Sequence, residues 1–165
     1  ITVVPQEPVL FSGKLRDTLD PFKSASDSEI MTALQRVELD RFVAELPGGL
    51  QAVVQEGGAN FSCGQRQLLC LARALLRESK VIVLDEATAN IDVETDFAIQ
   101  RTIRREFAQA TVLVVAHRLG TVIDSDLMMV LDSGKLSEFG APEQLLSSPD
   151  SALSGFVREL QQGAA

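Results

Sequence analysis

Two adjacent carboxylates follow an apolar run near the middle of the sequence. Asp85 and Glu86 come directly after residues 81–84, Val-Ile-Val-Leu. A continuous apolar run of this length is typical of a strand buried on both faces, and the residues after such a strand open onto a site at the carboxyl edge of a sheet. Paired carboxylates are residue types that can bind a divalent cation or activate water. A solvated strand end would give the same two residues, so the pair alone leaves both interpretations open.

A hydroxyl stands at the expected start of a helix earlier in the chain. Ser62 precedes apolar residues at helical spacing in residues 68–76, and Ser is a preferred N-cap. The helix beginning there would present backbone N–H groups that have no acceptor within the helix. An ordinary Ser-capped helix is the alternative interpretation.

Three further polar side chains follow apolar runs or begin a helix. His117, the only histidine, comes after the apolar residues 111–116, and Gln6 comes after a short β-branched run that ends at Pro5. Asp92 is placed to cap a helix that runs to about residue 107. A lone histidine, a loop glutamine and a capping aspartate each have a structural explanation when taken singly.

Strands alternate with helices along the chain, which predicts an α/β domain on a largely parallel sheet with its site at the carboxyl strand ends. A helical region over residues 27–46, capped by Ser26 or Asp27 and stopped by Pro-Gly-Gly, lies inside an expected helical insert. The other expected elements are strands at residues 1–4, 81–84 and 111–116, a hairpin at 127–139 and two helical pieces within 142–160.

Composition limits the classes of function. The chain has 165 residues, of which 45% are hydrophobic, so one domain or part of one is expected. Its net charge of −8 disfavours nucleic acid as the main partner, and its apolar runs are too short to cross a bilayer. Cys63 and Cys70 match neither a zinc site nor a disulfide framework, so we expect reduced thiols.

Four motifs occur in a fixed order, and together they resemble the ATP-binding cassette (ABC) ATPase family over nearly the whole chain. They are residues 4–8, 61–67, 81–88 and 116–118. The resemblance implies a P-loop NTPase-like ABC ATPase domain that uses ATP and Mg²⁺. It also implies one partial domain over residues 1–165, with the helical insert and signature helix at about 14–76 and the remaining motifs and C-terminal helices at about 77–165.

The resemblance also implies roles for the polar residues at the strand ends. Asp85 would hold Mg²⁺, usually through water, and Glu86 would polarise the attacking water. Gln6 resembles the Q-loop glutamine, which reaches Mg²⁺ or its waters. His117 resembles the switch histidine that hydrogen-bonds the γ-phosphate, and Asp92 resembles the D-loop aspartate that crosses the interface between two cassettes.

Residues 61–65 resemble the family signature, usually Leu-Ser-Gly-Gly-Gln, which contacts a γ-phosphate held by the opposing cassette. Ser62, Gly64 and Gln65 retain the signature residues, and the contacts with phosphate are expected at the hydroxyl of Ser62 and the backbone N–H of Gly64. Phe61 replaces the usual Leu, and Cys63 replaces the middle glycine.

Other short motifs are similar to the subfamily of the multidrug-resistance-associated proteins, and a glutamate at position 86 points to its second cassette. They are residues 17–22, 56–58, 87–90 and 123–126. The chain contains no Gly-x-x-x-x-Gly-Lys-Ser/Thr loop to cradle phosphates, and the family places that loop before Gln6. We therefore expect a C-terminal fragment that is inactive by itself and exposes apolar surface.

The leading hypothesis is a part of an ABC exporter in which ATP binding and hydrolysis drive transmembrane transport. Its expected partners are a second nucleotide-binding domain across an ATP sandwich and the transmembrane domains of the same transporter, at the cytoplasmic face of a membrane. One alternative is a soluble ABC ATPase acting on DNA or ribosomes, although the stretch from Gln6 to Phe61 is too short for the long coiled coil of the DNA-repair relatives. The other is a non-catalytic truncated fragment that binds a partner cassette.

Overall fold

The computed structural model describes residues 1–85, 93–115 and 123–163. The chain divides into two compact units, Ile1–Val115 and Ala116–Ala165. Each unit has its own secondary structure and is described by itself below.

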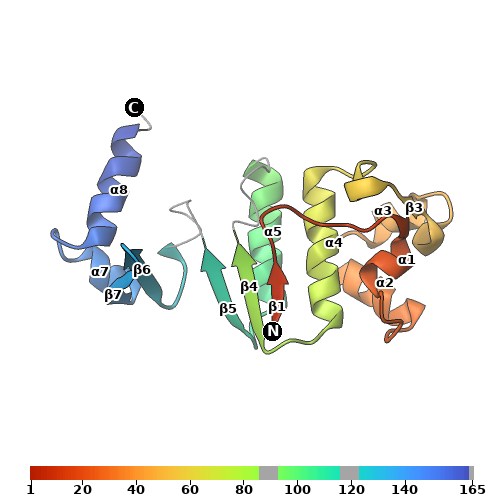
Figure 1. Cartoon of the computed structure of the whole chain (residues 1–165), viewed down its shortest axis with the longest axis horizontal. Coiled ribbons are helices and arrows are strands. Elements are labelled where there is room, and N and C mark those ends of the chain that lie inside the picture. Colours follow the sequence, from red (N-terminus) through yellow and green to blue (C-terminus); the bar gives the residue numbers. More distant parts are fainter. Residues whose placement is uncertain (86–92, 116–122, 164–165) are drawn as a thin grey trace. The chain divides into compact units, whose positions relative to one another are not determined.

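A parallel sheet lies at the centre of the first unit. Its described strands are β1 (Thr2–Val4), β4 (Val81–Asp85) and β5 (Thr111–Val115), in the order β1-β4-β5 with both pairings parallel (Figure 1). Val4 pairs with Leu84, and Asp85 pairs with Val115. All three strands therefore end at the same edge, as the predicted α/β architecture requires.

The three strands differ in burial. Ile82 and Leu84 of β4 are buried, whereas Leu113, Val114 and Val115 of β5 are 41%, 44% and 51% exposed. The prediction of a buried strand at residues 111–116 is thus wrong for the described residues of β5. The physical reason is that β5 has β4 on one side and is the last strand of the described sheet, so fewer neighbours cover it.

Two long helices accompany the sheet. α4 (Cys63–Leu76) contacts β1, and α5 (Val93–Glu106) contacts α4. Figure 1 shows α5 behind the strands and α4 between the sheet and a group of shorter helices. The predicted helices at residues 62–76 and 92–107 are confirmed over their described parts, whereas the predicted cap of the second, Asp92, lies outside the described residues.

The helical insert consists of short elements. α2 (Asp27–Arg36) begins with a capping box in which the Ser26 hydroxyl accepts from the Glu29 backbone N–H and the Glu29 carboxylate accepts from the Ser26 backbone N–H. The predicted helical region stops at Pro47 as expected but is interrupted at Glu38, which has a left-handed φ of 62°. The other elements are α1 (Leu15–Leu19), α3 (Asp40–Glu45), η1 (Gly49–Gln51), η2 (Glu56–Gly58), β2 (Gly13–Lys14) and β3 (Val53–Val54).

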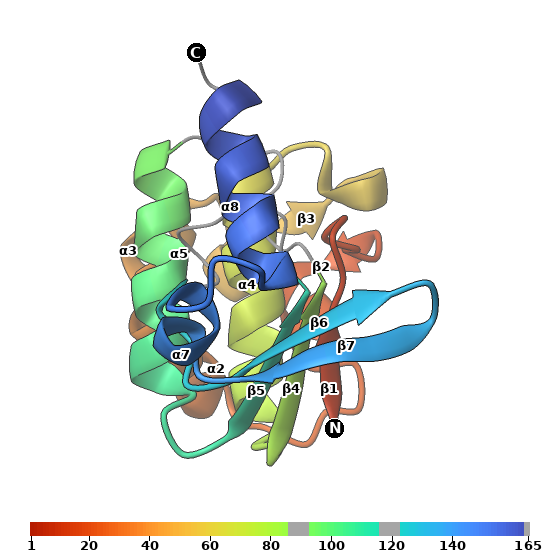
Figure 2. The same cartoon turned by 90° about the vertical axis from the view of Figure 1, so that its left-hand side faces the viewer.

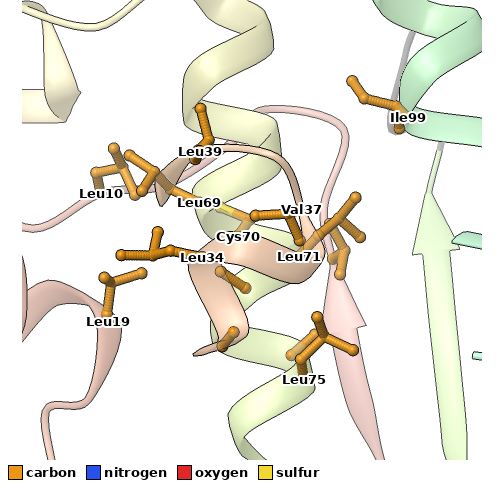
Figure 3. Packing of buried hydrophobic residues seen from close by; sticks show 14 of the residues in the cluster. Leu10, Leu19, Leu34, Val37, Leu39, Leu69, Cys70, Leu71, Leu75 and Ile99 are labelled. Atoms are coloured by element: carbon orange, nitrogen blue, oxygen red, sulfur yellow. The ribbon is translucent and has the colours of Figure 1, made fainter. Parts of the chain in front are cut away.

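One hydrophobic core joins the insert to the sheet. Leu34 and Val37, from α2 and its C-cap, face Leu69, Cys70 and Leu71 of α4 (Figure 3). All five side chains are at most 1% exposed. α4 therefore packs against both α2 and β1.

The described residues of the second unit include the predicted hairpin and the two predicted C-terminal helices. β6 (Met128–Asp132) pairs with β7 (Lys135–Gly140) across a two-residue turn in which Ser133 and Gly134 have φ values of 49° and 75° (Figure 2). Two successive positive φ values match the twist of a hairpin. α7 (Pro142–Leu146) and α8 (Ala152–Gly163) follow, and the Glu138 carboxylate accepts hydrogen bonds from the first backbone N–H groups of α8.

The described helices are all too short or too polar to cross a bilayer. Across residues 1–85, 93–115 and 123–163, none combines the length and the apolar character that a membrane span needs.

Candidate functional site

The carboxyl edge of the sheet carries Asp85. It is the last residue of β4 and is exposed, and it pairs with Val115, the last residue of β5. In the sequence Glu86 follows β4 directly and His117 comes two residues after β5. Glu86 and His117 both lie outside the described residues, so the structure places only the strand ends that precede them in the sequence.

Gln6 lies near the same edge. β1 ends at Val4, whose partner Leu84 immediately precedes Asp85, and Gln6 is exposed two residues beyond Val4. The structure therefore brings the segments that carry Gln6 and Asp85 to one edge. Carboxylate and amide oxygens are ligand types that suit Mg²⁺. In the described segments, no group of three or more His, Cys, Asp or Glu residues is arranged to hold a metal ion.

The N-terminus of α4 is closed by a second capping box. The Ser62 hydroxyl accepts a hydrogen bond from the Gln65 backbone N–H at 3.1 Å, and the Gln65 side-chain oxygen accepts one from the Ser62 backbone N–H at 2.9 Å. The prediction that Ser62 caps this helix is confirmed. The first N–H groups of the helix, those of Cys63 and Gly64, have no acceptor within it, so this end favours an anion.

Gly64 is buried against α5. A Cβ at this position would lie 2.5 Å from the Cγ2 methyl of Thr95, well inside the van der Waals distance. Packing against Thr95 therefore favours glycine at this position. Sequence analysis did not identify Thr95, because the contact joins two helices and no local pattern reports it.

Gln67 lies one turn further along α4. Its side chain is fully buried, and in the described structure neither its amide oxygen nor its amide nitrogen has a hydrogen-bond partner. A buried amide without partners costs about 1–3 kcal/mol. The motif that contains Gln67 could be found in the sequence, but its burial could not.

A network of ion pairs fixes α5 against the end of α2. The Glu106 carboxylate accepts from Arg36 at 2.5 Å and from Arg105 at 2.6 Å, and Arg105 also donates to the backbone oxygen of Arg36. Glu38 contacts Arg105 at 3.6 Å and Arg101 at 3.3 Å. Burial raises the pKa of Glu106, but the hydrogen bonds and charges of the two arginines outweigh it and hold that pKa below its ordinary value.

Known proteins share much of this sequence. The model of the ABC transporter family matches residues 1–89. Over 148 residues the chain is 61% identical to ATP-binding cassette sub-family C member 2 of Mus musculus, covering 90% of this chain and 10% of the mouse protein. It is 55% identical over 151 residues to the probable multidrug resistance-associated protein lethal(2)03659 of Drosophila melanogaster, covering 92% of this chain and 11% of that protein.

A solved structure is also similar. The structure of a bacterial Atm1-family ABC exporter with ATP bound matches with a TM-score of 0.86 at 32% identity, covering 96% of this chain and 28% of that chain. The chain thus spans about a tenth of the length of its curated relatives and under a third of the exporter chain.

Proposed function

The chain belongs to the ABC transporter family, and we propose that it is part of an ATPase cassette whose binding and hydrolysis of ATP power transmembrane transport. The observation that supports this proposal is the common edge at which β1, β4 and β5 end. Four candidate residues end or follow these strands in the sequence. They are Gln6, Asp85, Glu86 and His117.

We assign each of these residues a separate task. Asp85 would hold Mg²⁺, and Gln6 would provide a second oxygen ligand to the ion or its waters. Glu86 accepts a proton from the attacking water, and His117 hydrogen-bonds the γ-phosphate and aligns the water. When bound, Mg²⁺ neutralises charge on the phosphates during transfer.

The second part of the proposal concerns the α4 N-terminus. Ser62, Gly64 and Gln65 contact the γ-phosphate of an ATP molecule that a second nucleotide-binding domain holds, and Asp92 crosses the interface between the two domains. The capping box supports this assignment, because it orients the Ser62 hydroxyl and leaves the first N–H groups of the helix available to an anion.

The proposed cycle couples two cassettes to membrane domains of the same transporter. The cassettes close around two ATP molecules, hydrolysis reopens them, and the membrane helices alternate between two states. The similarity to sub-family C relatives and the glutamate at position 86 support the second cassette of a multidrug-resistance-associated exporter, on the cytoplasmic side of a membrane. The sequence holds no phosphate-binding loop, so the chain by itself should not turn over ATP.

Two matched serine substitutions test the role of the α4 N-terminus. Ser26 and Ser62 both cap helices through complete capping boxes, so Ser26→Ala and Ser62→Ala should each lower the free energy of unfolding by about 1 kcal/mol. Both changes are made in the complete polypeptide, in which this chain is joined to a phosphate-binding loop. We expect Ser62→Ala to lower ATP turnover about tenfold or more, because it also removes a hydrogen bond to phosphate worth about 1.5–3 kcal/mol.

Ser26→Ala is the control, since α2 takes no part in the proposed site. ATP turnover of Ser26→Ala should stay within about twofold of the turnover of the unsubstituted protein, because the substitution removes no contact with the nucleotide. Equal turnover in the two variants would show that the Ser62 hydroxyl serves only as a helix cap.

A further inference from the structure

The contact between Gly64 and Thr95 is limited to a single methyl group. A Cβ at position 64 would lie 2.5 Å from Thr95 Cγ2 but 3.7 Å from Thr95 Cβ and 3.9 Å from Thr95 Oγ1. The last two distances are ordinary van der Waals contacts. Among these three atoms, the Cγ2 methyl group is the one with which a Cβ at position 64 would clash.

The contact joins two elements that matter for the proposed site. Gly64 lies two residues from Ser62 in the first turn of α4, and Thr95 lies in the first turn of α5, the helix that begins just after Asp92. α5 is itself anchored at its other end to α2 by the arginine and glutamate network around Glu106. The Gly64–Thr95 contact therefore lies where the first turns of α4 and α5 approach each other.

We propose that Thr95 is a positioning residue for the phosphate-binding end of α4, and that the contact with its methyl group is one reason for glycine at position 64. This inference rests on the proposed function. Thr95 acts through Gly64: its methyl group fixes how closely α4 approaches α5, and this determines where the Ser62 hydroxyl and the Gly64 N–H are presented. A misplacement of about 1 Å in such a group can cost about a hundredfold in rate.

A requirement for glycine that came from the ligand alone would give a different pattern among variants. If glycine is needed only so that the backbone can approach a phosphate, Gly64→Ala is harmful whatever residue occupies position 95. If the contact with Thr95 matters, the harm depends on the Cγ2 methyl group. Replacing Thr95 by serine deletes this methyl group and retains the hydroxyl, whereas replacing it by valine retains the methyl group and deletes the hydroxyl.

The test uses the complete polypeptide that carries this chain and a phosphate-binding loop. The variants are Gly64→Ala, Thr95→Ser, Thr95→Val and the two double variants with Gly64→Ala. ATP turnover, equilibrium binding of ATP and the melting temperature are measured for each. We expect Gly64→Ala to lower turnover about tenfold or more while equilibrium binding of ATP changes less than about twofold, because the α4 N-terminus acts on a nucleotide held by the opposing cassette.

Rescue decides the outcome. Turnover of Gly64→Ala with Thr95→Ser should return to within about threefold of Thr95→Ser alone, whereas Gly64→Ala with Thr95→Val should remain as slow as Gly64→Ala. If ATP turnover falls equally in all three proteins that carry Gly64→Ala, the inference is overturned and the proposed function stays intact. Rescue of the melting temperature without rescue of turnover would also overturn it, since the contact would then affect stability alone. Absence of ATP turnover in the unsubstituted polypeptide would remove the proposed function and this inference together.

Discussion

Gln67 carries a buried side-chain amide that has no hydrogen-bond partner among the described residues. Gln67→Met keeps the length of the side chain and removes both polar atoms. We expect the free energy of unfolding of the chain to rise by about 1–3 kcal/mol, because an unpaired buried amide is no longer desolvated. Equilibrium unfolding in urea of an ATPase domain in which this chain is joined to a phosphate-binding loop measures the change.

Gln35→Met provides the control, because Gln35 is an exposed glutamine on α2. This substitution should change stability by less than about 0.5 kcal/mol. A loss of stability in Gln67→Met would contradict the prediction and would mean that the amide makes a hydrogen bond in solution.

At the scale of residues, the sequence predicts local features well and contacts between segments poorly. The Ser62 cap was predictable because the Ser-x-x-Gln pattern and the following apolar residues are local. The clash that a side chain at position 64 would make with Thr95 was not predictable, because it depends on how α4 approaches α5. The burial of Gln67 depends in the same way on packing around α4.

At the scale of elements, the network around Glu106 should make the attachment of α5 to α2 depend on pH. Because the pKa of Glu106 lies below its ordinary value of 4.5 in the folded chain, the ionised carboxylate stabilises the fold. This stabilisation is complete at pH values above the pKa that Glu106 has in the unfolded chain. It is lost as the pH falls below about 4.5 and then through the lower pKa that Glu106 has in the folded chain. Glu106→Gln should therefore flatten the acid limb of a plot of unfolding free energy against pH.

The matched control is Glu45→Gln, which makes the same chemical change at an exposed position of α3. Chemical unfolding of the ATPase domain completed by a phosphate-binding loop, at several pH values between about 3 and 7, measures both variants over the range in which carboxylates titrate. If Glu106→Gln and the unsubstituted chain lose stability in parallel as the pH falls, the network does not contribute to the attachment.

The elements themselves were largely predictable from periodicity, with two instructive exceptions. The break between α2 and α3 falls at Glu38, whose left-handed backbone usually requires glycine or asparagine. Glutamate is found there with its carboxylate in contact with Arg101 and Arg105, which are distant in the sequence. The apolar run of β5 predicted burial, but a run of this kind cannot show whether neighbouring elements cover both sides of a strand.

At the scale of the whole molecule, the sheet exposes a large apolar surface. Besides three residues of β5, Ile1 is 84% exposed and Val3 is 58% exposed. Exposed strand edges and apolar patches promote association between chains. We therefore expect the chain expressed alone to be marginally stable or to aggregate, with a broad or irreversible thermal transition. A sharp, reversible two-state melt of a soluble monomer would contradict this prediction.

The family and the α/β fold were predictable at this scale because four motifs occur in a fixed order along one chain. The family match over residues 1–89 and the similarity to a bacterial exporter confirm the family and the fold. The division into the units Ile1–Val115 and Ala116–Ala165 was not predicted. This division depends on the density of contacts between distant segments, and the spacing of motifs in the sequence gives no information about those contacts.

The central claim is that ATP turnover depends on the carboxylate that follows β4. The most direct test is ATP hydrolysis by the complete polypeptide, reconstituted in vesicles, with Glu86→Gln compared against the exposed control Glu143→Gln in α7. We predict that Glu86→Gln retains ATP binding and lowers turnover by about a hundredfold, the typical contribution of a positioned general base, while the control leaves turnover unchanged. Near-normal turnover in Glu86→Gln would contradict the account.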